Sequence, residues 1–383
     1  MKLLFITGQI NQYGGVERTL SDKINYLNSK GHEICVVTYA QMGKPLSFIL
    51  NNGVLHFDID CRYFTYYKLP IYKRIWKLFQ IKLQFRKRLS SIIRSFLPDV
   101  IIVTMAMNRF YLNDISSVAG NAKIVVESHN IYQDLFINVP ISERLFYLFH
   151  HPLRIMAQAD MLVLLTHEDA KAWKKWNVKN LKVIPNPLPL YIEKLSGCQR
   201  KEGRIISVGR LATEKRYDRL INAFAILADK YPLWYIDIYG YGPEEKHLLE
   251  IIRMQGLMGR INIHKPTSQI YKEYESSQML VLSSDLESFG LVLIEAMACG
   301  TPVVSVNCPH GPSEIIDDRE TGLLSEMNVD DLAIKMEWMM THDKERAEMG
   351  IKAHLAVAKY KKEVIMNNWE TAYISLKSHN PEI

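Results

Sequence analysis

Cysteine is scarce in this 383-residue chain, and long apolar runs are absent. The five cysteines include no pair separated by two residues, which argues against a disulfide framework or a structural zinc site and favours a reducing compartment. No stretch of 18 apolar residues occurs, so we expect no membrane-spanning helix. The apolar run at residues 3–6 is too short for a signal-peptide core. We therefore expect a cytoplasmic protein, and any membrane contact to be peripheral, at the inner face of the plasma membrane.

Acidic residues are missing from residues 61–98, a segment that holds ten basic ones. The imbalance extends further, because residues 1–195 carry a net charge of +11 and the remainder −5. Pro70 and Pro98 bracket a predicted helix. Its apolar side chains follow a 4-3 rhythm that predicts one stripe: Ile71, Ile75, Leu78, Phe85, Leu89, Ile92 and Phe96.

Two interpretations of this basic helix remain open. It lies on an anionic membrane, or it packs on the protein and leaves a solvated basic face. The same segment is a candidate for the acceptor side of a site, and no recognised nucleic-acid module accompanies the charge. The candidate membrane or acceptor residues are Lys73, Arg74, Trp76, Lys77, Arg86 and Lys87.

Apolar strands alternate with helical segments along the whole chain. This order predicts an α/β fold with two doubly wound, Rossmann-like parallel sheets. Three prolines within residues 185–189 interrupt the pattern and predict a hinge between two lobes. Ligands of such sheets bind beyond the carboxyl ends of the strands, so we expect the site in a cleft between the lobes.

The most specific motif places two glutamates, Glu287 and Glu295, with seven residues between them. On one helix these side chains would diverge by about 80°. If Glu287 lies on a loop and Glu295 in the following helix, they can instead reach opposite ends of one elongated ligand. The residues between them, 288–291, would open the helix and offer free amides to an anion. An acid, an anion site and a second acid suit a nucleotide sugar.

Other glycine-rich or cationic loops follow predicted strands. Gly209 ends the strand at residues 204–209, and Arg210 and Lys215 come next, where both can meet a diphosphate. Gly15 opens a helix after the first strand, and Gly240 follows another strand near a possible base pocket.

Two further motifs have less specific spacing. His129 follows the strand at residues 122–127, where a polar catalytic contact is plausible. Asp58 and Asp60 match the pattern D-x-D, which we interpret as a strand end and not as a metal site.

These motifs together resemble family 4 of the retaining GT-B glycosyltransferases, in the branch that builds cell-surface polysaccharides and lipopolysaccharides. The resemblance is strongest over residues 204–325, through VGRLATEKRYDRLI, IYGYGPEEKHL and LESFGLVLIEAMACGTPVVS. It implies an acceptor-side lobe formed by residues 1–188 and 361–383, and a nucleotide-sugar lobe formed by residues 189–360. It also implies a nucleoside-diphosphate-sugar donor, favoured as a UDP-sugar, a saccharide or polyprenyl-linked acceptor, and no metal cofactor.

The resemblance assigns a role to each matching position. Arg210 and Lys215 would neutralise the leaving diphosphate, and Glu295 would hold the ribose diol. Glu287 and the amides of Phe289, Gly290 and Leu291 would hold the sugar. His129 would contact the sugar near the reacting carbon, and Gly15 would approach the diphosphate. A two-lobed nucleotide-sugar epimerase, a metal-dependent GT-A transferase and a non-catalytic donor-binding subunit are the competing classes.

Overall fold

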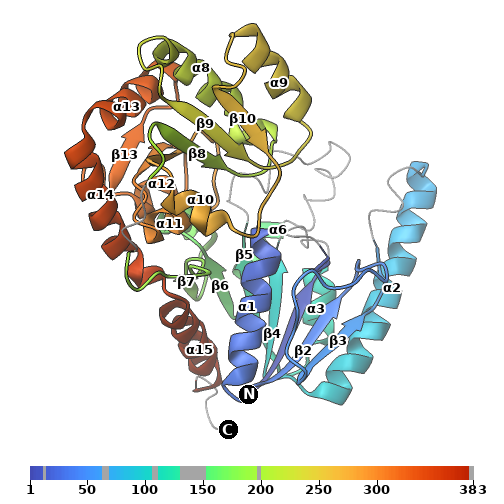
Figure 1. The fold of residues 1–383 in the computed structure, drawn as a ribbon. Helices are drawn as coiled ribbons and strands as arrows, with labels where there is room; N and C mark the ends of the chain where they lie inside the picture. Colours follow the sequence, from blue (N-terminus) through green and yellow to red (C-terminus); the bar gives the residue numbers. More distant parts are fainter. Residues whose placement is uncertain (12–13, 63–68, 106–110, 130–151, 196–199, 379–383) are drawn as a thin grey trace. The chain divides into compact units, whose positions relative to one another are not determined.

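The computed structural model describes residues 1–11, 14–62, 69–105, 111–129, 152–195 and 200–378. Lys68 of the basic segment and Cys198 lie outside these ranges. The chain divides into two compact units (Figure 1). The N-terminal unit comprises Met1–Pro185 and Met366–Ile383, and the C-terminal unit comprises Asn186–Ile365.

The N-terminal unit is built on a seven-stranded parallel sheet in the order β3-β2-β1-β4-β5-β6-β7. The strands are β1 (Lys2–Thr7), β2 (Glu33–Thr38), β3 (Val54–Asp58), β4 (Val100–Met105), β5 (Lys123–Ser128), β6 (Met161–Leu164) and β7 (Leu181–Val183). The helices are α1 (Gly15–Ser29), α2 (Ile71–Phe96), α3 (Leu112–Val118), α6 (Pro152–Ala157), α7 (His167–Trp173), the 3₁₀ helix η2 (Lys174–Trp176) and α15 (Lys362–Ser378). Because crossover helices cover parallel strands, β1 and β5 read in the sequence as continuous apolar runs.

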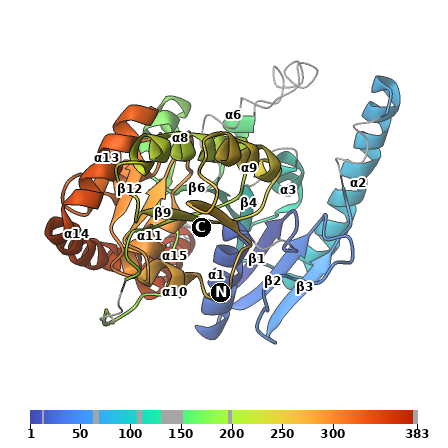
Figure 2. The ribbon, with the colours of Figure 1, turned by 45° about the horizontal axis from the view of Figure 1, so that its top comes forward.

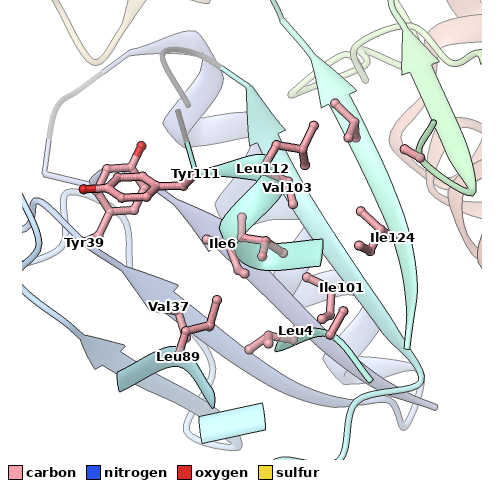
Figure 3. Close-up of a cluster of buried hydrophobic side chains, with 14 of the residues drawn as sticks. Leu4, Ile6, Val37, Tyr39, Leu89, Ile101, Val103, Tyr111, Leu112 and Ile124 are labelled. Carbon is pink, nitrogen blue, oxygen red and sulfur yellow. The ribbon is translucent and has the colours of Figure 1, made fainter. Parts of the chain in front are cut away.

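The core of this unit lies where apolar side chains of the strands meet the inner face of α2 (Figure 3). Phe85 of α2 stacks on Tyr111 with ring centroids 4.0 Å apart, and Tyr39 meets both rings edge-on. The Tyr111 hydroxyl donates a hydrogen bond to the carbonyl of Cys61. The aromatic group therefore joins α2 to the sheet and to the chain that follows β3.

Helix α2 carries two apolar faces, where the sequence predicted one stripe. Ile81, Phe85, Leu89, Ile93 and Phe96 are buried. The second set is exposed and, apart from Ile75, is centred roughly 130° around the helix from the first by helical spacing: Tyr72, Ile75, Trp76, Phe79 and Leu83. Ile75 lies on the predicted stripe by helical spacing, but it is 65% exposed. In Figures 1 and 2 the amino-terminal half of α2 extends away from the sheet, so no strand of the described part of the chain covers this second face there.

The C-terminal unit contains a six-stranded parallel sheet in the order β10-β9-β8-β11-β12-β13. The strands are β8 (Arg204–Val208), β9 (Tyr235–Tyr239), β10 (Ile261–His264), β11 (Met279–Leu282), β12 (Val303–Val306) and β13 (Gly322–Ser325). The helices are η3 (Thr213–Lys215), α8 (Tyr217–Ala228), α9 (Glu245–Met254), α10 (Ile270–Glu275), α11 (Leu291–Ala298), α12 (Pro312–Ile315), α13 (Val329–Thr341), α14 (Asp343–Ala356) and η4 (Val357–Tyr360). A core of aliphatic and methionine side chains fills the space between this sheet, α8 and α13.

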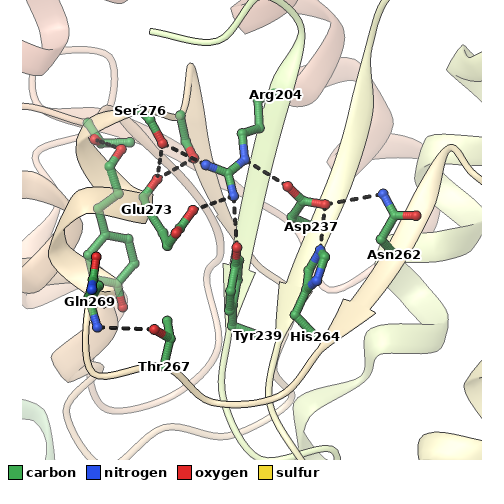
Figure 4. A network of polar contacts seen from close by, with 12 residues as sticks. Arg204, Asp237, Tyr239, Asn262, His264, Thr267, Gln269, Glu273 and Ser276 are labelled. Carbon is green, nitrogen blue, oxygen red and sulfur yellow. Dashed lines mark hydrogen bonds and ion pairs between the residues drawn. The ribbon is translucent and has the colours of Figure 1, made fainter. Parts of the chain in front are cut away.

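A buried arginine connects β8 to β9 and α10 through hydrogen bonds (Figure 4). Arg204, the first residue of β8, donates hydrogen bonds to Asp237 of β9 at 2.8 Å and to Glu273 of α10 at 2.7 Å. Burial alone would raise the pKa of Asp237, but hydrogen bonds from His264 and Arg204 lower it. The aspartate therefore stays ionised and balances the charge of the buried guanidinium.

Two strands had no predicted bounds. The exposed residues of β3 include Leu55 and Phe57, so a buried apolar run is missing there, although Asp58 does end this strand as predicted. The four residues of β13 include only two with large apolar side chains, Leu323 and Leu324.

Among the described residues, none of the helices has the length and apolar content needed to cross a membrane.

The two faces of α2 should respond differently to truncation. We expect Phe85→Ala to lower the free energy of unfolding by about 3–5 kcal/mol, because a buried ring leaves a cavity. Phe79→Ala, on the exposed face, should change it by less than about 0.5 kcal/mol. Differential scanning calorimetry of both variants measures the difference, and equal effects would contradict this assignment of the faces.

Candidate active site

The loop after β8 presents the predicted cations in the C-terminal unit. Gly209 follows the strand, and the backbone there passes so close to Gly240 that a Cβ atom at Gly240 would lie 2.0 Å from the Gly209 carbonyl oxygen. Glycine is therefore required at residue 240. Arg210 is exposed and makes no ion pair with any residue that the structure describes. Its guanidinium is available to an anionic ligand.

Lys215 and Glu287 meet although 72 positions separate them. The Lys215 Nζ atom donates a hydrogen bond to Glu287 Oε1 at 2.7 Å, and the Ser284 hydroxyl donates to the same oxygen at 2.7 Å. Glu287 is buried, whereas the Lys215 side chain is about a quarter exposed. The pair joins the loop after β8 to the loop after β11, and it places a buried carboxylate beside a cation that a ligand can reach.

Two arginines fix these loops to each other. Arg219 of α8 donates to the carbonyl of Ser283 at 2.8 Å and to Asp285 at 2.5 Å. Arg216 contacts the second oxygen of Asp285 at 2.9 Å. The amide of Asp285 also donates to the carbonyl of Glu214. Lys215 and Glu287 therefore lie within a frame of ion pairs and backbone bonds.

Helix α11 begins immediately after this frame. Its N-cap residue, Gly290, has φ +97°, a backbone conformation that favours glycine. No side chain caps the helix, so its first amides are not satisfied by a cap and point beyond the helix end. Phe289 is buried and Leu291 half-buried. The predicted arrangement is confirmed in that Glu287 lies on the loop and Glu295 in the helix.

Glu295 is held by a tyrosine that the sequence analysis did not single out. Tyr274 of α10 is fully buried, and its hydroxyl donates a hydrogen bond to Glu295 Oε2 at 3.1 Å. Burial, together with the charge of Glu295, raises the pKa of Tyr274 well above its usual range. The phenol thus remains a hydrogen-bond donor and orients the carboxylate.

The N-terminal unit presents its own candidates at the carboxyl ends of β1 and β5. Gly15 is the first residue of α1, whose N-cap Gly14 offers no side chain. His129 directly follows β5 and is buried. Its Nε2 atom lies 3.8 Å from Glu127 Oε2. Burial raises the pKa of Glu17, in the first turn of α1. An electrostatic interaction with His129 partly offsets this rise.

The candidates on α2 divide into two groups. Lys73, Trp76 and Lys77 lie exposed in the amino-terminal half of the helix, where Arg74 is half-buried. Lys87 is exposed further along the helix. Arg86 differs from them, because its Nε atom donates to the buried carboxylate of Asp114 in α3 at 2.5 Å.

The sequence analysis missed Ser284, Asp285, Arg216, Arg219 and Tyr274. Arg216 and Arg219 come one and four positions after Lys215, and this run of cations is a usable signal. Tyr274 has no such signal, because its role depends on a contact with a residue of the following helix.

Comparison with known proteins agrees with this architecture. The family model "Glycosyl transferases group 1" matches residues 193–355, and "Glycosyltransferase Family 4" matches residues 13–190. An uncharacterized glycosyltransferase of Haemophilus influenzae is 26% identical over 96% of this chain and 99% of its own length. The amylovoran biosynthesis glycosyltransferase AmsD of Erwinia amylovora is 24% identical over 96% and 98%. A TarM variant of S. aureus, solved with fondaparinux, alpha-GlcNAc-glycerol and UDP, superposes with a TM-score of 0.75 at 15% identity over 97% and 99% of the two chains.

Two parallel-sheet units with charged and glycine-rich loops at the carboxyl ends of their strands define the GT-B class of transferase. The chain belongs to the group 1, or family 4, glycosyltransferases and is an enzyme of this retaining family.

The frame around Lys215 should depend on Asp285. We expect Asp285→Asn to lower the free energy of unfolding by about 1–3 kcal/mol, because Arg219 is buried and would lose its charged acceptor. Glu337→Gln is the matched control, since it removes a surface partner of the exposed Lys230 and should cost less than about 1 kcal/mol. Calorimetric unfolding of the two variants measures the difference. An equal loss would show that the Asp285 contacts stabilise the protein no more than an exposed ion pair does.

Proposed function

We propose that this enzyme transfers a hexosyl or N-acetylhexosaminyl unit from a UDP-sugar to a lipid-linked saccharide acceptor during cell-surface polysaccharide synthesis. The Lys215–Glu287 contact carries the proposal, because it joins a diphosphate-binding cation to a sugar-binding acid. The relationship to an amylovoran biosynthesis enzyme supports the pathway class. A TarM structure of the same fold that holds UDP supports the nucleotide.

The donor-binding roles follow the resemblance residue by residue. Arg210 and Lys215 neutralise the diphosphate, and Glu295 binds the ribose hydroxyls. Glu287 binds sugar hydroxyls together with the amides at the start of α11. Gly15 lets the backbone approach the diphosphate, Gly209 ends the strand before the two cations, Gly240 shapes the base pocket, and His129 contacts the sugar.

Lys215 can hold Glu287 and a phosphate oxygen at the same time. An ammonium group has three N–H donors, and Glu287 occupies one of them. The remaining two donors are sufficient for a diphosphate oxygen. The ion pair therefore fixes the lysine before the donor arrives, which reduces the ordering required in the transition state.

The proposed step breaks the bond between the anomeric carbon and the diphosphate oxygen. A bond from the acceptor hydroxyl forms on the same face, so the configuration is retained, and a donor phosphate oxygen takes the acceptor proton. Negative charge grows on the leaving diphosphate, where Arg210 and Lys215 stabilise it. A trapped glycosyl–enzyme intermediate would overturn this path.

Replacing Lys215 tests the proposed function directly. We expect Lys215→Ala to lower kcat by roughly 10²–10³, because one preorganised donor to the developing charge is lost, while the protein stays folded. UDP release from UDP-hexoses, with and without saccharide acceptors, measures the turnover.

Lys230→Ala, at an exposed lysine of the same unit, is the control and should retain wild-type turnover. Wild-type turnover in Lys215→Ala would remove its assignment. Conversion of the free donor without any acceptor would instead favour an epimerase.

We further propose that the exposed face of α2 lies on an anionic membrane, where it would bring the enzyme to a lipid-linked acceptor. Trp76 is 63% and Phe79 55% exposed, and their rings stack with centroids 6.3 Å apart. Lys73 and Lys77 lie one helical turn apart beside these rings. Aromatic side chains flanked by lysines are typical of helices that lie in a membrane interface.

Removal of the two lysines should weaken vesicle binding. Each basic residue near an anionic surface contributes about 1 kcal/mol, so Lys73→Ala/Lys77→Ala should bind roughly thirtyfold more weakly at low salt. Lys171→Ala/Lys174→Ala, at two exposed lysines elsewhere in the same unit, should bind as the wild type does. Sedimentation with phosphatidylglycerol vesicles measures this, and equal binding by all three proteins would refute the proposal.

A further inference from the structure

A buried ion pair in the N-terminal unit has no role in the donor-binding scheme. Lys23 of α1 donates to Glu127 Oε2 of β5 at 2.6 Å, and the two side chains are only 1% and 2% exposed. Such pairs seldom add stability, because removing two charges from water costs about as much as their attraction returns. The presence of this pair therefore calls for a second explanation.

Helix α15 completes the surroundings of the pair. The hydroxyl of Tyr373 donates to Glu127 Oε1 at 2.8 Å, and the Lys23 ammonium lies 3.6 Å from the centre of the Trp369 ring. Both oxygens of Glu127 thus have donors that come from opposite ends of the sequence. The geometry leaves the carboxylate little freedom to turn.

Glu127 is ionised in this setting. Burial alone would raise its pKa, but the Lys23 ammonium and the neighbouring donors lower it to about 2. Burial also raises the pKa of Tyr373, so the phenol keeps its proton and remains a donor. Glu127 therefore presents a fixed negative charge to whatever lies beside it.

His129 lies beside that charge. Its Nε2 atom is 3.8 Å from Glu127 Oε2, within range of electrostatic attraction. Its Nδ1 atom is buried and has no hydrogen-bond partner among the residues that the structure describes. A carboxylate facing Nε2 favours the tautomer that carries its proton there, which leaves Nδ1 as an acceptor. Glu17 is a second carboxyl group that interacts electrostatically with this ring.

We propose that Glu127 is a positioning residue for His129: held by Lys23 and Tyr373, it keeps the imidazole proton on Nε2, leaves Nδ1 unprotonated and so fixes the ring that the proposed function places against the donor sugar. The consequence for catalysis rests on the proposed function, whereas the effect on the tautomer does not. The competing explanation is that the pair only fastens α1 and α15 to β5.

A charge-neutral double variant separates the two explanations. Lys23→Met/Glu127→Gln removes both charges together, so it leaves neither of them buried without its partner. We expect the imidazole ¹⁵N resonances of His129, assigned by their loss in His129→Ala, to change from the Nε2–H pattern to a mixture of tautomers. We expect kcat for UDP-sugar turnover to fall about ten- to a hundredfold, because the fixed negative charge beside the ring is lost, with little change in KM.

The control is Lys2→Met/Glu33→Gln, which removes a lysine–glutamate pair at the amino ends of β1 and β2 and should change neither readout. If the double variant does not fold, Glu127→Asp keeps the charge beside Lys23 but withdraws it from His129, and the same tautomer change is expected. An unchanged tautomer in a folded variant would overturn the proposal. Absence of sugar transfer in the wild type would instead refute the proposed function, and the tautomer result would still stand.

Discussion

The contact between Lys215 and Glu287 is the interaction on which the candidate site of the C-terminal unit depends. It joins two loops that follow different strands, β8 and β11. Arg216 and Arg219 make the contact possible, because they bring the loops together on the two oxygens of Asp285. A rigid cation needs this support, because a flexible lysine would lose conformational entropy on binding the proposed diphosphate. In this protein the conformational entropy of Lys215 is instead lost during folding, when the surrounding contacts form.

Both units use the same solution for buried charge. Arg204 lies among Asp237 and Glu273, and Lys23 lies against Glu127. In each case a cation on one element meets acids on others, so desolvation is offset only when the tertiary fold is complete. These clusters therefore specify which elements pack together, in addition to any chemistry they support. The cluster at Lys23 includes the last helix, and the N-terminal unit is complete only when the end of the chain has been added.

The sequence predicted the elements better than the contacts. Strands such as β1 and β11 are buried on both faces and appear as apolar runs, whereas β3 exposes Leu55 and Phe57 and gives only a weak signal. The spacing of Glu287 and Glu295 left open whether both lie on one helix, and the structure places Glu287 on a loop and Glu295 in α11. The contact of Glu287 with Lys215 could not be predicted, because no local pattern reports which loops meet across a sheet. The contact of Tyr274 with Glu295 could not be predicted for the same reason.

Helix α2 shows where periodicity reaches its limit. Apolar residues every three or four positions identify an amphipathic helix, but a helix with two such stripes satisfies the rule on both sides. The sheet covers one stripe along the carboxyl-terminal half, through Phe85 and Leu89. The other stripe, with Trp76 and Phe79, remains in contact with water. Exposing large rings is unfavourable unless something covers them, and lysines at their flank select for a negatively charged surface. The same basic helix is therefore packed along one face and left open along the other, so the two interpretations of the sequence are not exclusive.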